Sequence, residues 1–479
     1  MHKMEIKHIL AIIPTGFLSR THKGFHIGNS AVPILRSLTP KEIKITVIDE
    51  NLGGKVDFNS NADVVLLMSV ITSSVPKAYR IARIFKNKGK IVGIGGPHPS
   101  VAPKEALEFC DFVNVGEMEG TWPKILEDIK KNKIKKIYQN KELVDLSTAP
   151  IPERDILRDM KKKGHDHEYV SIANIYTTRG CPYGCSFCTV SNIYGRKYRT
   201  RPVKKVIEDI LRTSGRGLGF AFFTDDNIWA IPEYAKELFR EIIRQKIKLK
   251  WISQASLAQV EDPELLRLAK KAGCSALYIG YESVNPESLK ETNKGFNKPD
   301  EFIRRTKLVQ KAGILVLGSF VFGFDSDTEK SIKATIDFAI NAKVDFAQFC
   351  VLTPFYNTAL YDKLKKEGRI FLEGTGGGEF HDNWSYYTFG NVVFKPKNLT
   401  PERLKELHLL GFQKFARAGP AFSRFLNGIV NYPFLNMIVV GFQLYSTFFG
   451  VPQGGMNPKK IIDANLRDWN KEYGHLLKK

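Results

Sequence analysis

The hydrophobic positions in the first third of the chain form short runs that alternate with amphipathic segments. Five runs are strand-like, at residues 8–15, 44–50, 63–70, 90–96 and 112–117. Helical patterns separate the later runs, as in PKAYRIARIFKNKG at 76–89. Such an alternation is typical of a parallel sheet that is covered on both faces. We therefore predict a doubly wound, flavodoxin-like parallel sheet over residues 1–135, with its ligand beyond the carboxyl ends of the strands.

A second series of strands and helices follows a connector. Residues 136–170 are polar and contain several prolines, as in the segment STAPIPERD. Six strand-like runs then alternate with helical segments, at 173–180, 219–226, 248–256, 276–283, 314–323 and 346–355. We therefore predict an open six-stranded (β/α) partial TIM barrel over residues 171–365. Its chemistry is expected on the loops at the carboxyl ends of the strands.

The alternation stops at about residue 366, and residues 366–479 are predicted to form a helical C-terminal region. Helices are expected at 401–418 and at 425–450. The second is rich in aromatic residues but is interrupted by Asn, Gln and Pro433, so it is not expected to span a bilayer. It would pack on the barrel, line an apolar pocket or lie on a membrane surface.

Composition and charge narrow the class of protein. Hydrophobic residues make up 43% of the 479 residues, which predicts packed domains rather than disorder. The 72 Lys and Arg residues outnumber the 50 Asp and Glu residues, and this favours an anionic partner: a phosphorylated substrate, a membrane surface or nucleic acid. The alternative is a set of solvated lysine faces. Six cysteines exclude a disulfide scaffold, and the absence of a secretory signal favours a cytoplasmic protein.

Three of the cysteines stand together in RGCPYGCSFC, directly after the first strand of the second series. Cys181, Cys185 and Cys188 have the spacing CxxxCxxC. Thiolates are soft ligands for iron–sulfur clusters or zinc. Structural zinc usually takes four ligands in paired short spacings, and the sequence has no second CxxC pair. Three cysteines on one tight loop would hold three corners of a 4Fe–4S cluster and leave the fourth iron open, while a zinc site remains the alternative.

This motif, at the head of a six-fold βα series, resembles that of the radical S-adenosylmethionine superfamily, including the aromatic Phe187 before the last cysteine. The resemblance implies a 4Fe–4S cluster on the three cysteines, with S-adenosylmethionine on the open iron. An external one-electron donor, such as ferredoxin or flavodoxin, would reduce the cluster. Cleavage of the sulfonium would then give a 5′-deoxyadenosyl radical that abstracts hydrogen from an unactivated carbon.

The polar ends of the barrel strands extend this resemblance. The segment TDDN at 224–227 stands where the family's GGE-like segment meets the methionine amino group, although it departs from GGE. The segment GYES at 280–283 resembles the family's GxES. The S-adenosylmethionine contacts implied by the resemblance are Phe187, Asp225, Asp226, Gln254, Ser256, Glu282 and Ser283. The alternative is that these are hydrogen-bonded strand ends without a ligand. The sequence assigns no catalytic residue.

The first domain resembles the cobalamin-binding domain of one branch of that superfamily. The branch includes the hopanoid methylases and the anaerobic magnesium-protoporphyrin monomethyl ester cyclase. The resemblance rests on segments 69–71, 95–99 and 115–117. The cobalamin contacts that it implies are Ser69, Thr72, Gly95, Gly96, His98, Gly116 and Glu117. A DxHxxG motif is absent, so cobalamin would bind without a His ligand to cobalt. The alternative is that the domain is a relic that binds no cofactor.

We therefore expect a radical enzyme that C-methylates an apolar, lipid or isoprenoid-like substrate with the help of cobalamin. The alternative is oxidative cyclisation or cross-linking of a lipid or tetrapyrrole without methyl transfer. A third hypothesis is a zinc- or cluster-stabilised protein that binds nucleic acid, but nucleic acid is not the favoured partner. The expected location is the cytoplasm, with peripheral membrane contact through the C-terminal helices.

Overall fold

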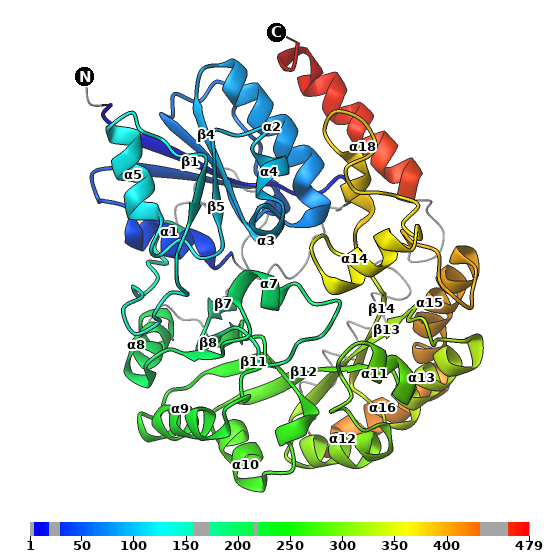
Figure 1. Ribbon diagram of the computed structural model, residues 1–479. Helices are drawn as coiled ribbons and strands as arrows, with labels where there is room; N and C mark the ends of the chain where they lie inside the picture. Colours follow the sequence, from blue (N-terminus) through cyan, green and yellow to red (C-terminus); the bar gives the residue numbers. More distant parts are fainter. Residues whose placement is uncertain (1–3, 19–28, 158–171, 215–218, 432–457, 479) are drawn as a thin grey trace.

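A computed structural model describes residues 4–18, 29–157, 172–214, 219–431 and 458–478 (Figure 1). Two parallel sheets form the two halves of the molecule, and α7 (Val190–Tyr194) lies between them. The predicted fold class is confirmed: a doubly wound sheet comes first, a six-stranded partial barrel follows, and helices make up most of the described C-terminal region.

The first sheet has six parallel strands in the order β2-β1-β3-β4-β5-β6. The strands are β1 (His8–Ile13), β2 (Lys44–Asp49), β3 (Val64–Leu67), β4 (Ile91–Gly95), β5 (Phe112–Val115) and β6 (Ile137–Gln139). Because the order reverses between β1 and β3, the loops after these strands diverge and leave a crevice there. The short edge strand β6 was not predicted, since only Tyr138 of its three side chains is buried.

Helices cover both faces of this sheet, which explains why its central strands β1, β3 and β4 are largely apolar. Successive residues of β1 point to opposite faces: Ile9 packs with α1 (Ala31–Leu38) and α5 (Trp122–Lys130), and Leu10 packs with α2 (Val75–Asn87). The remaining helical elements of this half are α3 (Pro97–Val101), α4 (Pro103–Ala106) and the 3-10 turns η1 (Glu50–Leu52) and η2 (Thr72–Ser74).

The second sheet is also parallel, with its six strands in chain order and no pairing between the outermost two among the described residues. They are β7 (Ile172–Ile175), β10 (Phe220–Phe223), β11 (Lys250–Ala255), β12 (Cys274–Glu282), β13 (Leu315–Phe322) and β14 (Phe346–Val351). A two-stranded antiparallel ribbon, β8 (Thr178–Arg179) and β9 (Arg199–Thr200), stands beside the first of them. The barrel is therefore open.

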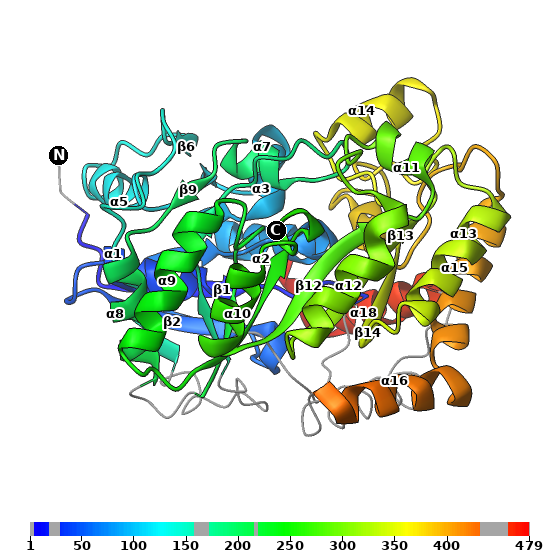
Figure 2. The ribbon, with the colours of Figure 1, turned by 90° about the horizontal axis from the view of Figure 1, so that it is seen from below.

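Helices lie on the outer side of these strands (Figure 2). They are α8 (Val203–Ser214), α9 (Pro232–Arg244), α10 (Pro263–Lys271), α12 (Phe302–Lys311) and α13 (Glu329–Asn341). The short helix α11 (Pro286–Glu291) and the 3-10 turns η3 (Leu257–Gln259) and η4 (Pro299–Glu301) lie in the connections between strands and helices. Side-chain caps begin several of them. Asp262 accepts from the Leu265 amide at the start of α10, and Thr328 and Ser331 form a capping box on α13.

The C-terminal region returns to both halves. It holds α14 (Ala359–Lys366), η5 (Asp382–Tyr386), α15 (Pro401–Phe415), α16 (Ala418–Asn431), α18 (Pro458–Tyr473) and η7 (Gly474–Leu476). The predicted helix at 401–418 is confirmed as α15, which packs on the barrel. Of the predicted second helix, residues 425–431 belong to α16, and residues 432–450 lie outside the described residues. None of the described helices has the length and apolar composition needed to cross a bilayer.

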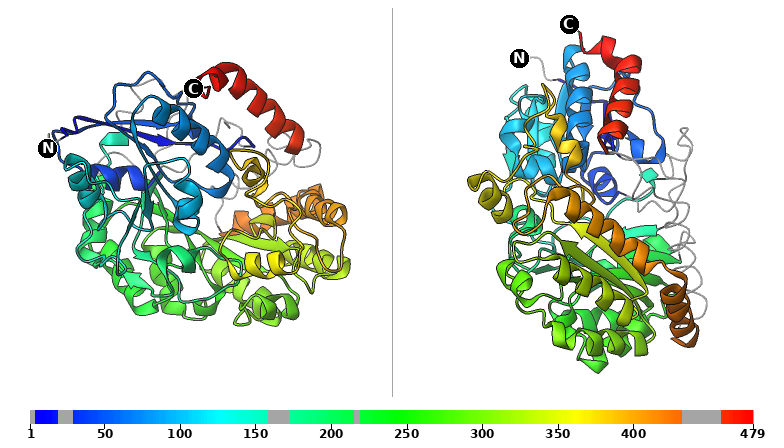
Figure 3. Two further views of the ribbon diagram at one scale, coloured as in Figure 1. Left: turned by 45° about the horizontal axis from the view of Figure 1, so that its top comes forward. Right: turned by 90° about the vertical axis from the view of Figure 1, so that its right-hand side faces the viewer.

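Two C-terminal segments dock on the first domain. Helix α18 runs along it (Figure 3) and places Ile462 and Trp469 in the core on the α2 side of the sheet. Arg80 on α2 donates two hydrogen bonds, of 2.6 and 2.9 Å, to the carboxylate of Asp382. Trp384 donates its indole N–H to Glu105 at 3.2 Å. The chain that leaves the barrel is thus fastened to the domain that precedes it.

One buried histidine makes the stability of this fold depend on pH. His408 on α15 is buried, and its Nε2 lies 2.9 Å from the carbonyl oxygen of Phe349 on β14. Burial and the nearby charge of Lys405 lower the pKa of His408 to about 4. Between pH 6.5 and pH 4 the unfolded chain therefore binds more protons than the folded one. The free energy of unfolding should fall by up to about 3 kcal/mol as the pH drops across this window.

We expect His408→Gln to flatten this part of the pH profile, because a glutamine amide can donate to the same carbonyl and does not titrate. Urea denaturation between pH 7.5 and pH 4 measures the effect. His475→Gln, at an exposed position, is the matched control and should keep the wild-type slope. An unchanged slope in His408→Gln would contradict the assignment.

Candidate active site

The carboxyl ends of the barrel strands surround a cavity of about 400 Å³. Side chains from the cysteine loop and from successive strands line it. Eight of the ten residues predicted for the barrel site meet there: Cys181, Cys185, Phe187, Cys188, Asp226, Gln254, Ser256 and Glu282. Asp225 and Ser283 do not line it. The structure therefore brings most of the sequence-predicted barrel residues into one space.

The cysteine loop runs from β8 to β9 and contributes three thiols to the cavity wall. Gly180 begins it at φ +85°, and a Cβ there would lie 2.6 Å from the carbonyl oxygen of Lys197, so only glycine fits. Burial raises the pKa of the Cys188 thiol to about 12. The described residues contain no His, Cys, Asp or Glu trio already arranged around a single ion. The fit to a cluster therefore rests on the donor set, three soft ligands on one loop facing one cavity.

Asp225 supports the loop from behind. It is fully buried and accepts hydrogen bonds from the backbone N–H and the hydroxyl of both Thr177 and Thr178, at 3.0 Å for the two Thr177 donors. Burial outweighs these bonds and raises the pKa of Asp225 to about 6. The next residue, Asp226, faces the cavity instead, and burial and Asp225 raise its pKa to about 6. Ser283, also buried, accepts from the amide of Asn285.

A lysine that lies outside every predicted motif belongs to the same wall. Lys294 forms an ion pair with Glu282, and both line the cavity. Burial lowers the pKa of Lys294, but Glu282 and the Cys185 thiol outweigh it and raise the pKa. A Cβ on Gly280 would lie 2.5 Å from a carboxylate oxygen of Glu282 and 2.7 Å from the lysine nitrogen, so glycine leaves room for the pair. Lys294 lies twelve residues after Glu282 in the sequence. The GYES segment, which predicted Glu282, therefore gives no indication of Lys294.

Beyond these polar groups the cavity wall is largely apolar. It includes Phe187, Val321, Val351, Leu352, Phe355 and Phe389. Phe389 is 55% exposed and packs edge-on against Phe355, so the aromatic pair forms part of the mouth. The hydroxyl of Tyr278 donates to Gln348 in the same wall. One part of the cavity is therefore charged, and another is suited to an apolar molecule.

The first domain has its own cavities at the carboxyl ends of its strands. One of about 540 Å³ and one of about 290 Å³ share Ser30, Ser69 and Ile71 in their walls. Four of the seven residues predicted for this domain line them: Ser69, Gly95, Gly96 and Gly116. Gly96 has φ +135°, and a Cβ there would lie 2.2 Å from the amide nitrogen of Val70. The backbone therefore comes to the cavity surface at a position that only glycine can occupy.

The other three predicted residues, Thr72, His98 and Glu117, do not line these cavities. The buried ring of His98 lies 3.3 Å from the hydroxyl of Thr72 and 3.2 Å from the carboxylate of Glu105. Glu117 faces the barrel, where Arg179 donates to it at 2.7 Å. The structure thus gives Thr72, His98 and Glu117 partners within the protein.

Helix α7, which begins two residues after Cys188, is a wall of both sites. Val190 at its start lines the barrel cavity, and Ile193 and Tyr194 at its end line the smaller cavity of the first domain. Burial raises the pKa of the Tyr194 hydroxyl. A ligand in the barrel and a ligand in the first domain would therefore face the two ends of one five-residue helix.

Comparison with known proteins identifies the family of this chain. The family model described as the radical SAM superfamily matches residues 175–339, from the end of β7 into α13. The chain is 33% identical over 401 residues to the bacteriochlorophyllide d C-12(1)-methyltransferase of Chlorobaculum tepidum, which covers 82% of this chain and 84% of that protein. It is also 25% identical over 349 residues to the hopanoid C-2 methylase of Rhodopseudomonas palustris. That match covers 70% of this chain and 64% of the methylase.

Among solved structures, the chain resembles the radical S-adenosylmethionine methyltransferase TsrM of Kitasatospora setae with cobalamin and a [4Fe-4S] cluster bound. The TM-score is 0.68 over 97% of this chain and 100% of that one, at 15% identity, which shows a shared fold. The predicted resemblance is thereby confirmed. The chain belongs to the radical S-adenosylmethionine superfamily and is an enzyme of the methyltransferase branch in which a doubly wound domain precedes the barrel.

Proposed function

We propose that this enzyme methylates an unactivated carbon of an apolar molecule, with a 4Fe–4S cluster and S-adenosylmethionine in the barrel cavity and cobalamin in the first domain. The observation that carries this proposal is the shared wall. Helix α7 follows the cysteine loop directly and borders the cavities of both domains. A methyl donor in one domain and a radical source in the other would have to reach the same carbon, and a shared wall between the two cavities supports this.

In this proposal, Cys181, Cys185 and Cys188 each ligate one iron of the cluster. When bound, the cluster with S-adenosylmethionine supplies the radical that removes hydrogen, and cobalamin supplies the methyl group. Burial raises the pKa of all three thiols. Because the thiolate is the form that ligates iron, cluster assembly would release protons.

The charged part of the barrel cavity suits the amino-acid end of S-adenosylmethionine. Asp226 would accept from its ammonium group, and Lys294 would donate to its carboxylate. The ion pair between Lys294 and Glu282 holds the lysine at the wall before a ligand arrives. Gln254 and Ser256, at the end of β11 and just after it, offer further hydrogen-bonding groups. These four residues would orient the cofactor.

The apolar side chains of the cavity would bind the substrate and exclude water from it. Phe187, Leu352, Phe355 and Phe389 offer surface without competing donors or acceptors. Exclusion of water protects a carbon-centred radical from side reactions. An apolar substrate would therefore gain both binding energy and protection from the same residues.

Cobalamin would lie against the glycine-rich carboxyl edge of the first sheet. Gly95, Gly96 and Gly116 keep side chains out of the way of a bulky ligand. Of the described residues that line the two cavities of this domain, none is a histidine. His98 is held by Glu105 and Thr72 instead. This supports binding without a His ligand to cobalt, while His22 and His26 lie outside the described residues.

The relatives favour a large apolar ring system as the substrate. One is named for a chlorin, bacteriochlorophyllide d, and the other for hopanoids, which are polycyclic lipids. We propose a substrate of one of these two classes. Oxidative cyclisation without methyl transfer is the second candidate function, and the two differ in the mass of the product.

The proposal predicts a cysteine-dependent cleavage of S-adenosylmethionine. The chain is reconstituted anaerobically with iron, sulfide and hydroxocobalamin, desalted, and incubated with dithionite, S-adenosylmethionine and either bacteriochlorophyllide d or a hopanoid. We expect about four irons per chain and retained cobalamin absorption. Cys185→Ala should lose most of the iron and lower 5′-deoxyadenosine formation at least about a hundredfold. Cys274→Ala, at a buried cysteine outside the cavity lining, is the matched control.

The products separate the candidate functions in this experiment. Methyl transfer predicts S-adenosylhomocysteine together with 5′-deoxyadenosine, and a product heavier by one methylene unit. Deoxyadenosine with an oxidised product of unchanged carbon number would favour cyclisation instead. A folded wild-type chain that assembles no cluster and forms no deoxyadenosine would contradict both.

The two neighbouring aspartates should respond differently to substitution. We expect Asp226→Asn to weaken S-adenosylmethionine binding about tenfold or more, since it removes the charge that meets the ammonium group, and to leave stability largely unchanged. Asp225→Ala should lower the free energy of unfolding by about 3 kcal/mol, because buried donors of Thr177 and Thr178 lose their acceptor. Anaerobic equilibrium dialysis and urea denaturation measure the two effects. Equal effects of both substitutions on binding would refute this division of roles.

A further inference from the structure

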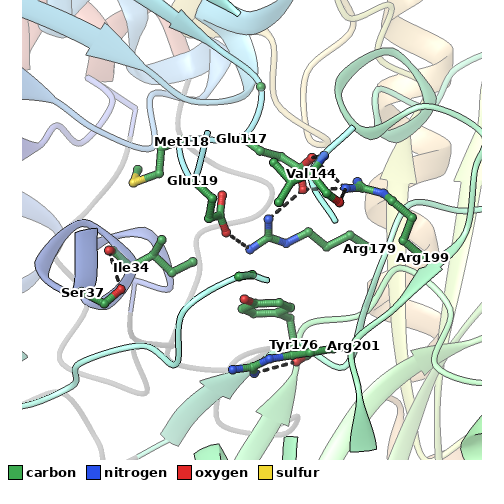
Figure 4. Close-up of polar contacts among 12 residues, drawn as sticks. Ile34, Ser37, Glu117, Met118, Glu119, Val144, Tyr176, Arg179, Arg199 and Arg201 are labelled. Atoms are coloured by element: carbon green, nitrogen blue, oxygen red, sulfur yellow. Dashed lines mark hydrogen bonds and ion pairs between the residues drawn. The ribbon is translucent and has the colours of Figure 1, made fainter. Parts of the chain in front are cut away.

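The loop that follows β5 presents alternate residues to the two domains (Figure 4). Gly116 and Met118 line the smaller cavity of the first domain. Glu117 and Glu119 point the other way and meet Arg179 at the start of the cysteine loop. Only single peptide units therefore separate the wall of the first-domain cavity from the residues that contact the barrel.

Arg179 joins both carboxylates at once. Its Nη1 donates to Glu117 at 2.7 Å and its Nη2 donates to Glu119 at 2.5 Å. The guanidinium carbon of Arg179 lies 4.2 Å from the centre of the Tyr176 ring, which covers it. The side chains of Glu117 and Glu119 are only 4% and 5% exposed, so these ion pairs are shielded from water. A shielded, forked contact has one favoured geometry and resists rearrangement.

Two arginines stand opposite each other at the base of the cysteine loop. Arg179 on β8 and Arg199 on β9 stand directly opposite each other in the two-stranded ribbon. All three motif cysteines lie between these two strands, within residues 180–198. Like charges in opposing positions destabilise a strand pair. Without a shared counter-ion, the base of the loop would tend to open.

Glu117 is that counter-ion. One of its carboxylate oxygens accepts from Arg179 at 2.7 Å, and the other accepts from Arg199 at 2.8 Å. Arg199 also donates to the carbonyl oxygen of Val144 at 2.7 Å. Glu117 thus holds the two ends of the cysteine loop together from outside the barrel. Its neighbour Gly116, at φ +71°, forms part of the cavity of the first domain.

We propose that Glu117 is a positioning residue that closes the base of the cysteine loop and couples the shape of that loop to the occupancy of the first-domain cavity. A ligand in that cavity would restrain Gly116 and Met118, and with them the carboxylate between them. The restrained carboxylate holds Arg179, which lies two residues before Cys181. The coupling rests on the proposed function for its ligand, cobalamin, whereas the closure of the loop does not.

The closure is tested on the cluster-free, full-length chain by the rate at which iodoacetamide alkylates each cysteine under anaerobic, reducing conditions. In Glu117→Gln we expect Cys181, Cys185 and Cys188 to react at least about fivefold faster than in the wild type, because the loop opens locally. The fully buried Cys110 and Cys274 should stay slow, and they report global unfolding in the same sample. Peptide mass spectrometry resolves the individual sites.

The control is Glu379→Gln, which removes the acidic partner of Arg83, an ion pair that no residue of the cysteine loop shares. It should leave all rates unchanged. Motif cysteines that react at the wild-type rate in Glu117→Gln would overturn the proposal. If Cys110 and Cys274 also become reactive, Glu119→Gln replaces Glu117→Gln as the test, since it keeps Glu117 and removes only the charge that pairs with Arg179. In Glu119→Gln we expect the motif cysteines to react about twofold faster than in the wild type, and an unchanged rate would overturn the proposal.

Hydroxocobalamin tests the coupling. We expect it to slow alkylation of the three motif cysteines in the wild type and to have little effect on them in Glu117→Gln when both proteins retain the cofactor after desalting. Equal protection in both would overturn the coupling, since protection would then be simple coverage by the ligand. Failure of the wild type to retain cobalamin would refute the cobalamin part of the proposed function and the coupling together, while the alkylation rates without cobalamin would still decide the closure.

Discussion

The buried carboxylate of Asp225 is the contact on which the cysteine loop depends. It accepts four hydrogen bonds from Thr177 and Thr178, which lie between β7 and the loop. Because Thr177 and Thr178 are buried, their donors need an acceptor within the protein. Asp225 therefore fixes the path of the chain as it leaves β7. Gly180 then makes the turn that L side chains resist. The position of the first thiol follows from a contact that never touches the cavity.

The far end of the loop is held by the other domain. Arg199 closes the ribbon onto Glu117, which belongs to the doubly wound half. Elsewhere at the interface, Arg80 binds Asp382 and fastens the chain that leaves the barrel to the first domain. Residues of both domains therefore hold the cysteine loop, and buried ion pairs join the first domain to the barrel.

The sequence was informative wherever the signal is local. Continuous apolar runs predicted the first parallel sheet, because helices on both faces bury every residue of a strand such as β3. Strand-like runs that alternate with helical segments predicted the second sheet, whose helices lie on its outer side. The edge strand β6 was missed because it buries only Tyr138. The three motif cysteines line one cavity, since residues within a stretch of eight cannot separate far. Lys294 was not found, because its contact with Glu282 depends on how the chain folds back after β12 rather than on spacing.

Motif residues at strand ends divide in a way that sequence alone does not reveal. Alternation holds within a strand, but after the last paired residue either neighbour can face the ligand side, as Asp225 and Asp226 illustrate. In the loop after β5, the side that each residue faces fits its chemistry. Gly116, which lacks a side chain, lines the cavity, and the charged Glu117 lies on the side of the arginines. A motif that marks a cofactor domain can therefore contain, in adjacent positions, one residue that shapes the cofactor site and one that ties the site to the rest of the enzyme.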